Sequence, residues 1–238
     1  MEITKEDLKR VYEQSTIKDG ESEGFFNVFI FRKISIYFSW FFASLGISPN
    51  AITILSFILN IIVSYLFFTG IYFNYISGLV LYTFALILDM SDGEVARLTN
   101  KKTEIGAFLD PFLDRLSFFL LMGAIAHGQY LNSGDSAVVY LYSIYLIISY
   151  LSLYVNNKAQ QIGGKRTIDI MRKTTEFIKN KDFKKYIKWD GGFACVFFAF
   201  FVVLNKLFLF ILIISAVDLL LLLFTYKNLI LRFKKNNE

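Results

Sequence analysis

Apolar residues follow one another in long, uncharged stretches along most of this chain. No Asp, Glu, Lys or Arg occurs in 34–88, a run of 55 residues. Two further uncharged stretches cover 116–134 and 136–157, and 191–226 contains only two charged residues. A helix that crosses a bilayer needs about 20 apolar residues. The pattern therefore predicts an all-α, polytopic membrane protein.

Turn-forming residues divide the apolar stretches into six expected transmembrane helices. Gly70, the Gly128–Asp135 stretch and the Asn205-Lys206 step supply the turns on one side of the membrane. The expected spans are 49–69, 73–97, 104–128, 136–158, 190–205 and 206–227.

The segment before the first span has a different character. Phe25–Ile47 is apolar, but Arg32 and Lys33 leave too few uninterrupted residues to cross a bilayer comfortably. We expect an interfacial amphipathic helix anchored by Trp40, followed by Ser48 and Pro49 at the start of the first span. The expected organisation is a cytoplasmic segment with the interfacial helix over 1–48, a transmembrane domain over 49–228 and a basic cytoplasmic tail over 229–238.

Composition and charge narrow the class further. Hydrophobic residues make up 55% of the chain and charged residues 19%, which excludes a soluble or a disordered protein. The single Cys195 cannot form an internal disulfide. The net charge of +5 indicates topology rather than nucleic-acid binding, since only Lys206 among the Lys and Arg residues falls on the side of the Gly70 turn. The positive-inside rule predicts cytoplasmic termini and loops, and a prokaryotic cytoplasmic membrane is the simplest location.

Four aspartates gather where the second expected span ends and the third begins. Asp89 and Asp92 are three residues apart and share one helix face, as do Asp110 and Asp114, which are four apart. The two helices are antiparallel neighbours, so we expect the four carboxylates to converge near the membrane boundary. Hard oxygen ligands without nearby His or Cys favour Mg²⁺ or Mn²⁺, and four of them can hold two ions. The alternative is a solvated loop with incidental acids.

Small residues and one arginine accompany these acids. Gly93 costs about 1 kcal/mol relative to Ala inside a helix, which the approach of a phosphate to the backbone would justify. Gly106 and Ala96 would leave a shallow slot across the loop, and Arg97 can hold a phosphate in bidentate fashion.

Together these residues form the pattern Asp89-x2-Asp92-Gly93-x2-Ala96-Arg97-x8-Gly106-x3-Asp110-x3-Asp114. The pattern resembles the full motif of the CDP-alcohol phosphotransferase (CDP-alcohol phosphatidyltransferase) family, and Pro49-Asn50-x2-Thr53 is similar to a second family motif. The resemblance implies that Asp89, Asp92, Asp110 and Asp114 bind two Mg²⁺ or Mn²⁺ ions, with Asp114 also the catalytic base. It further implies a CDP pocket formed by Asn50, Thr53, Gly93, Ala96, Arg97 and Gly106.

The implied reaction moves a phospho-alcohol group from a CDP-linked lipid, such as CDP-diacylglycerol or an archaeal equivalent, to the hydroxyl of a polyol or polyol phosphate. CMP is released. Arg115 and the residues around Lys18–Ser35 are similar to the branch that uses inositol or inositol phosphate, although Asn156 and Trp189 depart from the arginines expected there. A homodimer is implied by the family alone.

A phosphorylated acceptor needs basic ligands. Arg115, Lys158, Lys165 and Arg166 are the candidates, but the basic 158–188 loop would equally suit attraction to anionic lipid headgroups. Asp218 lies inside the sixth expected span, where an acid is a functional candidate or pairs with a hydroxyl on a neighbouring helix. His127 is too far along the third span to be a metal ligand.

Other functions remain open at this point. A glycerol 3-phosphate acceptor is one alternative. A divalent-cation transporter is another, although it would need acids near the bilayer midplane and access to both sides. A catalytically silent scaffold would not be expected to retain all four aspartates.

Overall fold

The computed structural model describes residues 3–18, 21–161 and 191–236, which are almost entirely helical. In chain order the elements are α1 (Lys5–Thr16), β1 (Ile17–Lys18), β2 (Glu21–Ser22), the π-helical turn η1 (Asn27–Phe31), α2 (Arg32–Ser44), α3 (Pro49–Phe68), α4 (Tyr72–Leu98), α5 (Glu104–Ser133), α6 (Ala137–Gln161), α9 (Gly191–Val203) and α10 (Leu207–Asn236). β1 and β2 form a short antiparallel pair.

The all-α membrane class is confirmed. Among the described residues, four helices are long and apolar enough to cross a bilayer: α3, α4, α6 and α10. Helices also occupy the other two expected ranges, but α5 carries charged residues in its first half and α9 has only 13 residues. The count of six spans is therefore not confirmed, although the helices themselves lie where the sequence predicts them.

The expected turns are present, and most of them contain a residue in the left-handed backbone conformation. Gly70 ends the α3–α4 turn at φ 75°, and Gly134 caps α5 at φ 66°. Asn205, between α9 and α10, has φ 54°. Asn100, in the loop from α4 to α5, has the same value. Glycine and asparagine adopt this conformation at the lowest cost, so these positions fix where each hairpin reverses.

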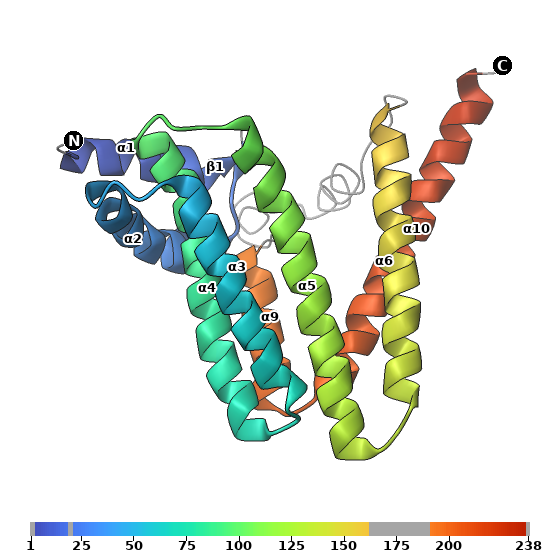
Figure 1. Ribbon diagram of the computed structural model, residues 1–238. Helices are drawn as coiled ribbons and strands as arrows, with labels where there is room; N and C mark the ends of the chain where they lie inside the picture. The colour runs from blue at the N-terminus through green and yellow to red at the C-terminus, as the bar shows by residue number, and fades with distance from the viewer. Residues whose placement is uncertain (1–2, 19–20, 162–190, 237–238) are drawn as a thin grey trace.

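The helices form two arms that diverge toward one end of the molecule (Figure 1). In the first arm α3 packs against both α4 and α5, and α9 lies against α4. The second arm is the pair α6 and α10, which contacts α5. Where the arms meet, buried side chains from α3, α4, α5, α6, α9 and α10 form a common core; among them are Phe67, Tyr75, Met122, Tyr145, Val202 and Ile211.

The N-terminal helices lie across the open end of the first arm (Figure 1). The α2 face toward α4 contains buried Ser35 and Ser39, while Tyr37, Trp40 and Phe41 on the other face are exposed. An exposed aromatic face is the one an interfacial helix presents to lipid. The position of α2 at the membrane interface stays a prediction.

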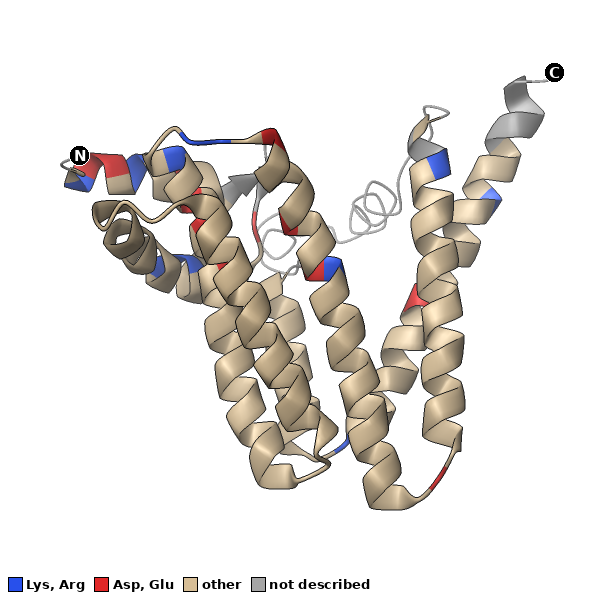
Figure 2. Cartoon of the chain, in the orientation of Figure 1, with Lys and Arg blue, Asp and Glu red and all other residues tan. Residues whose placement is uncertain are grey.

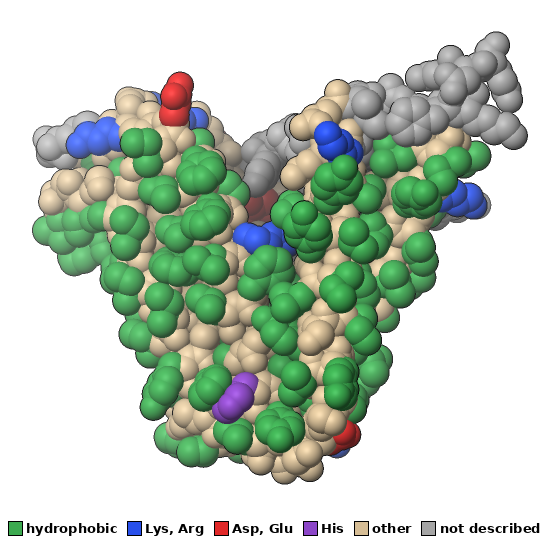
Figure 3. Space-filling view, turned by 45° about the vertical axis from the view of Figure 1, so that its right-hand side comes forward, with side chains coloured by type: hydrophobic (Ala, Val, Ile, Leu, Met, Phe, Trp, Pro, Cys, Tyr) green, Lys and Arg blue, Asp and Glu red, His purple; other side chains and the backbone are tan. Residues whose placement is uncertain are grey.

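Charged residues gather at one end of the molecule, the end at which α1 and the last turns of α10 lie (Figure 2). The flanks of both arms are covered by hydrophobic side chains (Figure 3). This distribution is what a bilayer requires of a spanning protein. It places the α4–α5 loop, with the acids on either side of it, at the charged end.

Candidate metal and phosphate site

The site is built where α4 ends and α5 begins. Thr103 is the N-cap of α5, and its Oγ1 accepts a hydrogen bond of 3.0 Å from the Gly106 amide. Such a cap satisfies one of the unpaired amides of the first turn. The short loop 99–103 thereby brings the last turns of α4 and the first turns of α5 side by side.

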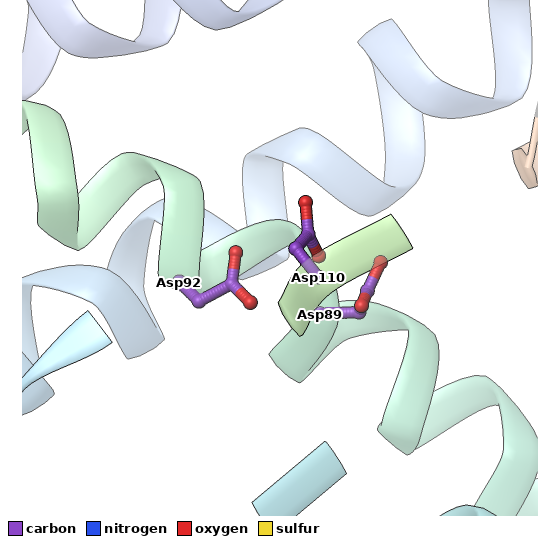
Figure 4. A group of neighbouring side chains, drawn as sticks. All are labelled: Asp89, Asp92 and Asp110. Atoms are coloured by element: carbon purple, nitrogen blue, oxygen red, sulfur yellow. The ribbon is translucent and has the colours of Figure 1, made fainter. Parts of the chain in front are cut away.

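Three carboxylates converge between these two helices. Asp89 and Asp92 extend from α4 and Asp110 from α5, and each contributes an oxygen to a group whose members all lie within 4.8 Å of one another. Figure 4 shows the three side chains pointing into the same space. The convergence expected from the spacing is therefore present for three of the four aspartates.

Asp114, the fourth acid, lies one helical turn beyond Asp110 and outside that group of three. Its carboxyl is within hydrogen-bonding range of Asp89, and the Asp114 residue is exposed. The fourth acid thus adjoins the cluster at its Asp89 side without sharing its centre.

Thr53 of α3 fixes one of the acids. Its Oγ1 donates a hydrogen bond of 2.5 Å to the Asp92 carboxylate, and both residues are buried. A hydroxyl that holds a ligating carboxylate restricts its rotation, which is a common supporting contact in metal sites. The Thr53 position, which the sequence associated with a nucleotide pocket, therefore contacts the acid cluster directly.

Gly93 and Arg97 adjoin the same acids on α4. A Cβ atom built on Gly93 would have only the Arg97 guanidinium nearby, at 3.6 Å or more. That guanidinium donates to the Ser15 hydroxyl of α1 at 2.7 Å, while the buried Arg97 Nε has no hydrogen-bond partner within the described residues. Open backbone beside a partly unsatisfied guanidinium is suited to an anionic group. Ala96 is half-buried on the same turn.

Gly106 and Asn50 meet across the start of α5. A Cβ atom on Gly106 would lie 2.6 Å from Asn50 Oδ1 and 3.0 Å from Thr103 Oγ1. Only glycine allows this approach between α3 and α5 without displacing a side chain. Asn50, from the first turn of α3, is thereby held beside the α4–α5 loop.

A buried network on the opposite face of α4 was not expected from the sequence. Glu94 is fully buried and accepts hydrogen bonds from Arg32 at 3.0 Å, Ser35 at 2.8 Å and Ser39 at 2.7 Å, all on α2. Arg32 also pairs with Glu23 at 2.9 Å. Burial alone lowers the pKa of Arg32, but the two carboxylates more than offset this and raise its pKa above the ordinary value. The network attaches α2 to the turn of α4 that carries Asp92.

The predicted acceptor residues are not brought together by the described part of the chain. Arg115 follows Asp114 and lines a cavity between the two arms. Lys158 is exposed at the end of α6, where it donates to Gln161 at 3.1 Å. Lys165 and Arg166 lie outside the described residues, as does Trp189. Of the two basic candidates that the structure describes, Arg115 is the one that lies next to the acids.

The chemistry of this donor set fits a divalent cation. Carboxylate oxygens are the ligands that Mg²⁺ and Mn²⁺ prefer, and three of them within 4.8 Å would repel one another without a cation or protons among them. Arg97 and the bare backbone at Gly93 lie on the same helix, which suits a phosphate held beside the cation.

Comparison with known proteins identifies relatives over most of the chain. The family model described as CDP-alcohol phosphatidyltransferase matches residues 46–225. A protein of Pyrococcus horikoshii named archaetidylinositol phosphate synthase is 36% identical over 122 residues, which cover 51% of this chain and 60% of that protein. A protein of Archaeoglobus fulgidus named bifunctional IPC transferase and DIPP synthase is 34% identical over 167 residues, or 68% of this chain and 32% of that protein. The chain thus spans less than two thirds of these relatives.

The fold is also that of a solved structure. Phosphatidylinositol phosphate synthase of Mycobacterium tuberculosis with CDP-DAG bound superposes with a TM-score of 0.58 at 19% identity, covering 82% of this chain and 93% of that one. The same enzyme in complex with manganese and citrate gives a TM-score of 0.51 at 20% identity, covering 80% and 88%. The two chains share an arrangement of helices.

Proposed function

Because the chain belongs to the CDP-alcohol phosphatidyltransferase family, we propose that it is a membrane-embedded transferase that moves a phosphatidyl-type group from a CDP-linked lipid to an alcohol. The observation that carries this proposal is the convergence of Asp89, Asp92 and Asp110 beside Gly93 and Arg97. Family membership favours a transferase over the cation transporter considered above.

In the proposed reaction the acceptor hydroxyl attacks the β-phosphorus of the CDP group. A new phosphorus–oxygen bond forms to the acceptor, the bond to the bridging oxygen breaks, and CMP leaves with that oxygen. Asp114 takes the hydroxyl proton, a role for which an exposed carboxylate next to the cluster is suited. The carboxylate must lie within hydrogen-bonding reach of the attacking oxygen for this role.

Metal binding is proposed at the same residues. Asp89, Asp92 and Asp110 would hold a divalent ion, and Asp114 would complete a second site beside Asp89. The chemistry that bound Mg²⁺ or Mn²⁺ supplies is neutralisation of charge on the attacking and leaving oxygens. The solved relative with manganese supports a divalent ion of this type.

The CDP group is proposed to bind over Gly93. Arg97 would donate to the phosphates, and Ala96, Gly106, Asn50 and Thr53 would line the pocket. The lipid tail would remain in the bilayer beside the apolar flanks. The solved relative with bound CDP-DAG supports a CDP-lipid as donor.

The proposed acceptor is a polyol phosphate of the inositol type. The names of the Pyrococcus and Mycobacterium relatives support it, and Arg115, Lys158, Lys165 and Arg166 remain the basic candidates. Glycerol 3-phosphate is the second candidate, since proteins named for that acceptor also match this chain; one from Pseudomonas fluorescens is 38% identical over 93 residues. The site and both termini are proposed to face the cytoplasm of a prokaryotic cell, and a homodimer is the proposed assembly.

The test is CMP release by the purified protein in detergent with Mg²⁺ or Mn²⁺, with CDP-diacylglycerol as donor. Inositol phosphate, inositol, glycerol 3-phosphate and serine would be compared as acceptors. We expect acceptor-dependent release that Asp114→Asn abolishes. Asp135→Asn is the matched control, because the Asp135 carboxylate accepts a 2.8 Å hydrogen bond from the Ala137 amide at the start of α6 and has no other partner among the described side chains. Absence of release with every acceptor, together with absence of metal-dependent CDP binding, would refute the proposal.

A further inference from the structure

A cavity of about 190 Å³ lies between the two arms, lined by α4, α5, α6, α9 and α10. Most of its lining is apolar, yet four of the side chains carry polar groups: Tyr82, Arg115, Tyr145 and Asp218. An apolar cavity inside a membrane protein has no need of four such groups. These groups make the cavity a candidate site for a polar molecule.

The cavity adjoins the acid cluster. Arg115 follows Asp114 on α5, and Tyr82 on α4 lies within electrostatic range of both Asp89 and Asp114. Figure 3 shows acidic and basic side chains exposed in the recess between the two arms. A molecule in the cavity would therefore be next to the proposed reaction centre.

Arg115 and Asp218 face this space from different helices, α5 and α10. They lie within electrostatic range of each other. Within the described residues, however, neither takes part in an ion pair or a hydrogen bond. A charged group inside a membrane span is expected to find a partner. Here an arginine of α5 and an aspartate of α10 line the same cavity.

Tyr145 adds a second unsatisfied group. The residue is fully buried, and its hydroxyl, though near Ser149, makes no hydrogen bond of acceptable geometry within the described residues. A buried hydroxyl without a partner is costly. A ligand with several hydroxyl groups would satisfy both Tyr145 and Asp218, since a carboxylate accepts hydrogen bonds from hydroxyls and a phenol can accept or donate.

We propose that this cavity receives the hydroxyl-bearing part of the acceptor and that Asp218 is the residue that selects for it. The inference rests on the proposed function and specifies its substrate. The cavity volume of about 190 Å³ is of the size that a small polyol needs. Arg115 lies toward the acids and suits the acceptor's anionic group, whereas Asp218 would repel a phosphate and accept from hydroxyls. The pair thus orients a polyol phosphate with its phosphate toward α5.

The test compares two phosphorylated acceptors that differ in their number of hydroxyls, inositol phosphate and glycerol 3-phosphate. KM and kcat would be measured for the wild-type protein and for Asp218→Leu. We expect KM for inositol phosphate to rise about tenfold or more, because hydrogen bonds to a charged group are among the stronger ones. KM for glycerol 3-phosphate should change about threefold or less, and kcat should stay within about twofold for both.

Two further variants separate recognition from packing. Tyr145→Phe keeps the ring and removes only the hydroxyl, so it should raise KM for inositol phosphate selectively and leave kcat unchanged. Ser215→Ala is the matched control on α10, because within the described part of the chain the Ser215 hydroxyl donates only to the Ile211 carbonyl of its own helix. Equal changes for both acceptors, or none, would overturn the inference while leaving the transferase proposal intact.

Failure of the proposed function gives a different result. If the wild-type protein releases no CMP with either acceptor and binds no CDP in the presence of Mn²⁺, both proposals fall together. If CMP is released and the Asp218→Leu protein is indistinguishable from wild type, only the role of Asp218 is refuted.

Discussion

A Cβ atom added at Gly93 would meet nothing closer than the Arg97 guanidinium at 3.6 Å, whereas one at Gly106 would lie 2.6 Å from Asn50 Oδ1. The two glycines of the motif are thus required for different reasons. At Gly106 the protein itself occupies the space. At Gly93 the space is open, so the proposed need for glycine comes from the phosphate that we propose to bind there.

This difference predicts opposite effects on stability. Gly93→Ala should raise the stability of the protein without ligand by up to about 1 kcal/mol, because Ala is the better helix former. It should also weaken CDP binding about tenfold or more. Gly106→Ala should lower stability and CDP binding together, since Asn50 must move. Thermal unfolding in detergent, with and without CDP, checks both; a Gly93→Ala protein with normal CDP affinity would contradict the reading of Gly93 as a phosphate contact.

Some of these residue contacts could be predicted from the sequence and others could not. Spacings of three and four residues place Asp89 with Asp92, and the short loop opposes them to Asp110, so local geometry sufficed for the cluster. The Arg97–Ser15 contact joins residues 82 positions apart. The hydrophobic pattern around Ser15 does not indicate this contact, because the sequence alone does not show which residue a polar side chain on a surface helix will contact.

At the scale of elements, the apolar stretches predicted the helices well, since a bilayer-spanning helix needs a continuous apolar run. The sequence did not predict how the N-terminal helices attach. From the sequence, Glu94 would be expected to be one of several exposed charged residues at the end of a span, yet it is fully buried against α2. Its hydrogen-bond partners Ser35 and Ser39 are uncharged, so the sequence of α2 does not predict a polar contact with α4.

Glu94→Gln should loosen the attachment of α2. Gln keeps the volume and can still bond Ser35 or Ser39, but it leaves the buried Arg32 with Glu23 as its only described acidic partner. Removing one charge of a buried pair is strongly destabilising, so we expect a loss of about 2–4 kcal/mol. Ser39→Ala, which removes one hydrogen bond, should cost about 1 kcal/mol. Thermal melts in detergent measure both, and equal stability of Glu94→Gln and wild type would show that the network does not hold α2.

The cap of α1 predicts a dependence on pH. Thr4 and Asp7 bond each other's backbone amides at 3.2 Å, and the Thr4 hydroxyl donates to Asp7 at 2.7 Å. The hydrogen bond from Thr4 lowers the pKa of Asp7 below its ordinary value. A lowered pKa stabilises the folded helix above the ordinary pKa, and this contribution disappears as the pH falls through the lowered value. Hydrogen exchange corrected for intrinsic rates should therefore show α1 losing protection in acid, and Asp7→Ala should abolish that pH dependence.

At the scale of the whole molecule, charge separates the two ends. The α4–α5 loop, α1 and the last turns of α10 lie at the charged end (Figure 2), and the Gly70 and Gly134 turns lie at the other. The sequence predicted this asymmetry from the positions of Lys and Arg alone. It could not predict the divergence of the two arms, because that depends on how side chains from six helices fit together in one core.

The asymmetry predicts the orientation in the membrane. In a Cys195→Ala background, where the buried native thiol is removed, Asp135→Cys should react with a membrane-impermeant maleimide in intact cells. Lys101→Cys should react only after the cells are lysed. The reverse labelling pattern would place the acid cluster on the outer face and refute a cytoplasmic site.

The contact between Arg32 and Glu94 has a consequence for biogenesis. The two residues are 62 positions apart, so Arg32 leaves the ribosome well before its partner. At about 5–20 residues per second the delay is on the order of several seconds, during which α3 and most of α4 are synthesised. Until then the hydrogen bond from Arg32 to Glu94 cannot form. We therefore expect α2 to attach to α4 through this contact only after α4 has been synthesised.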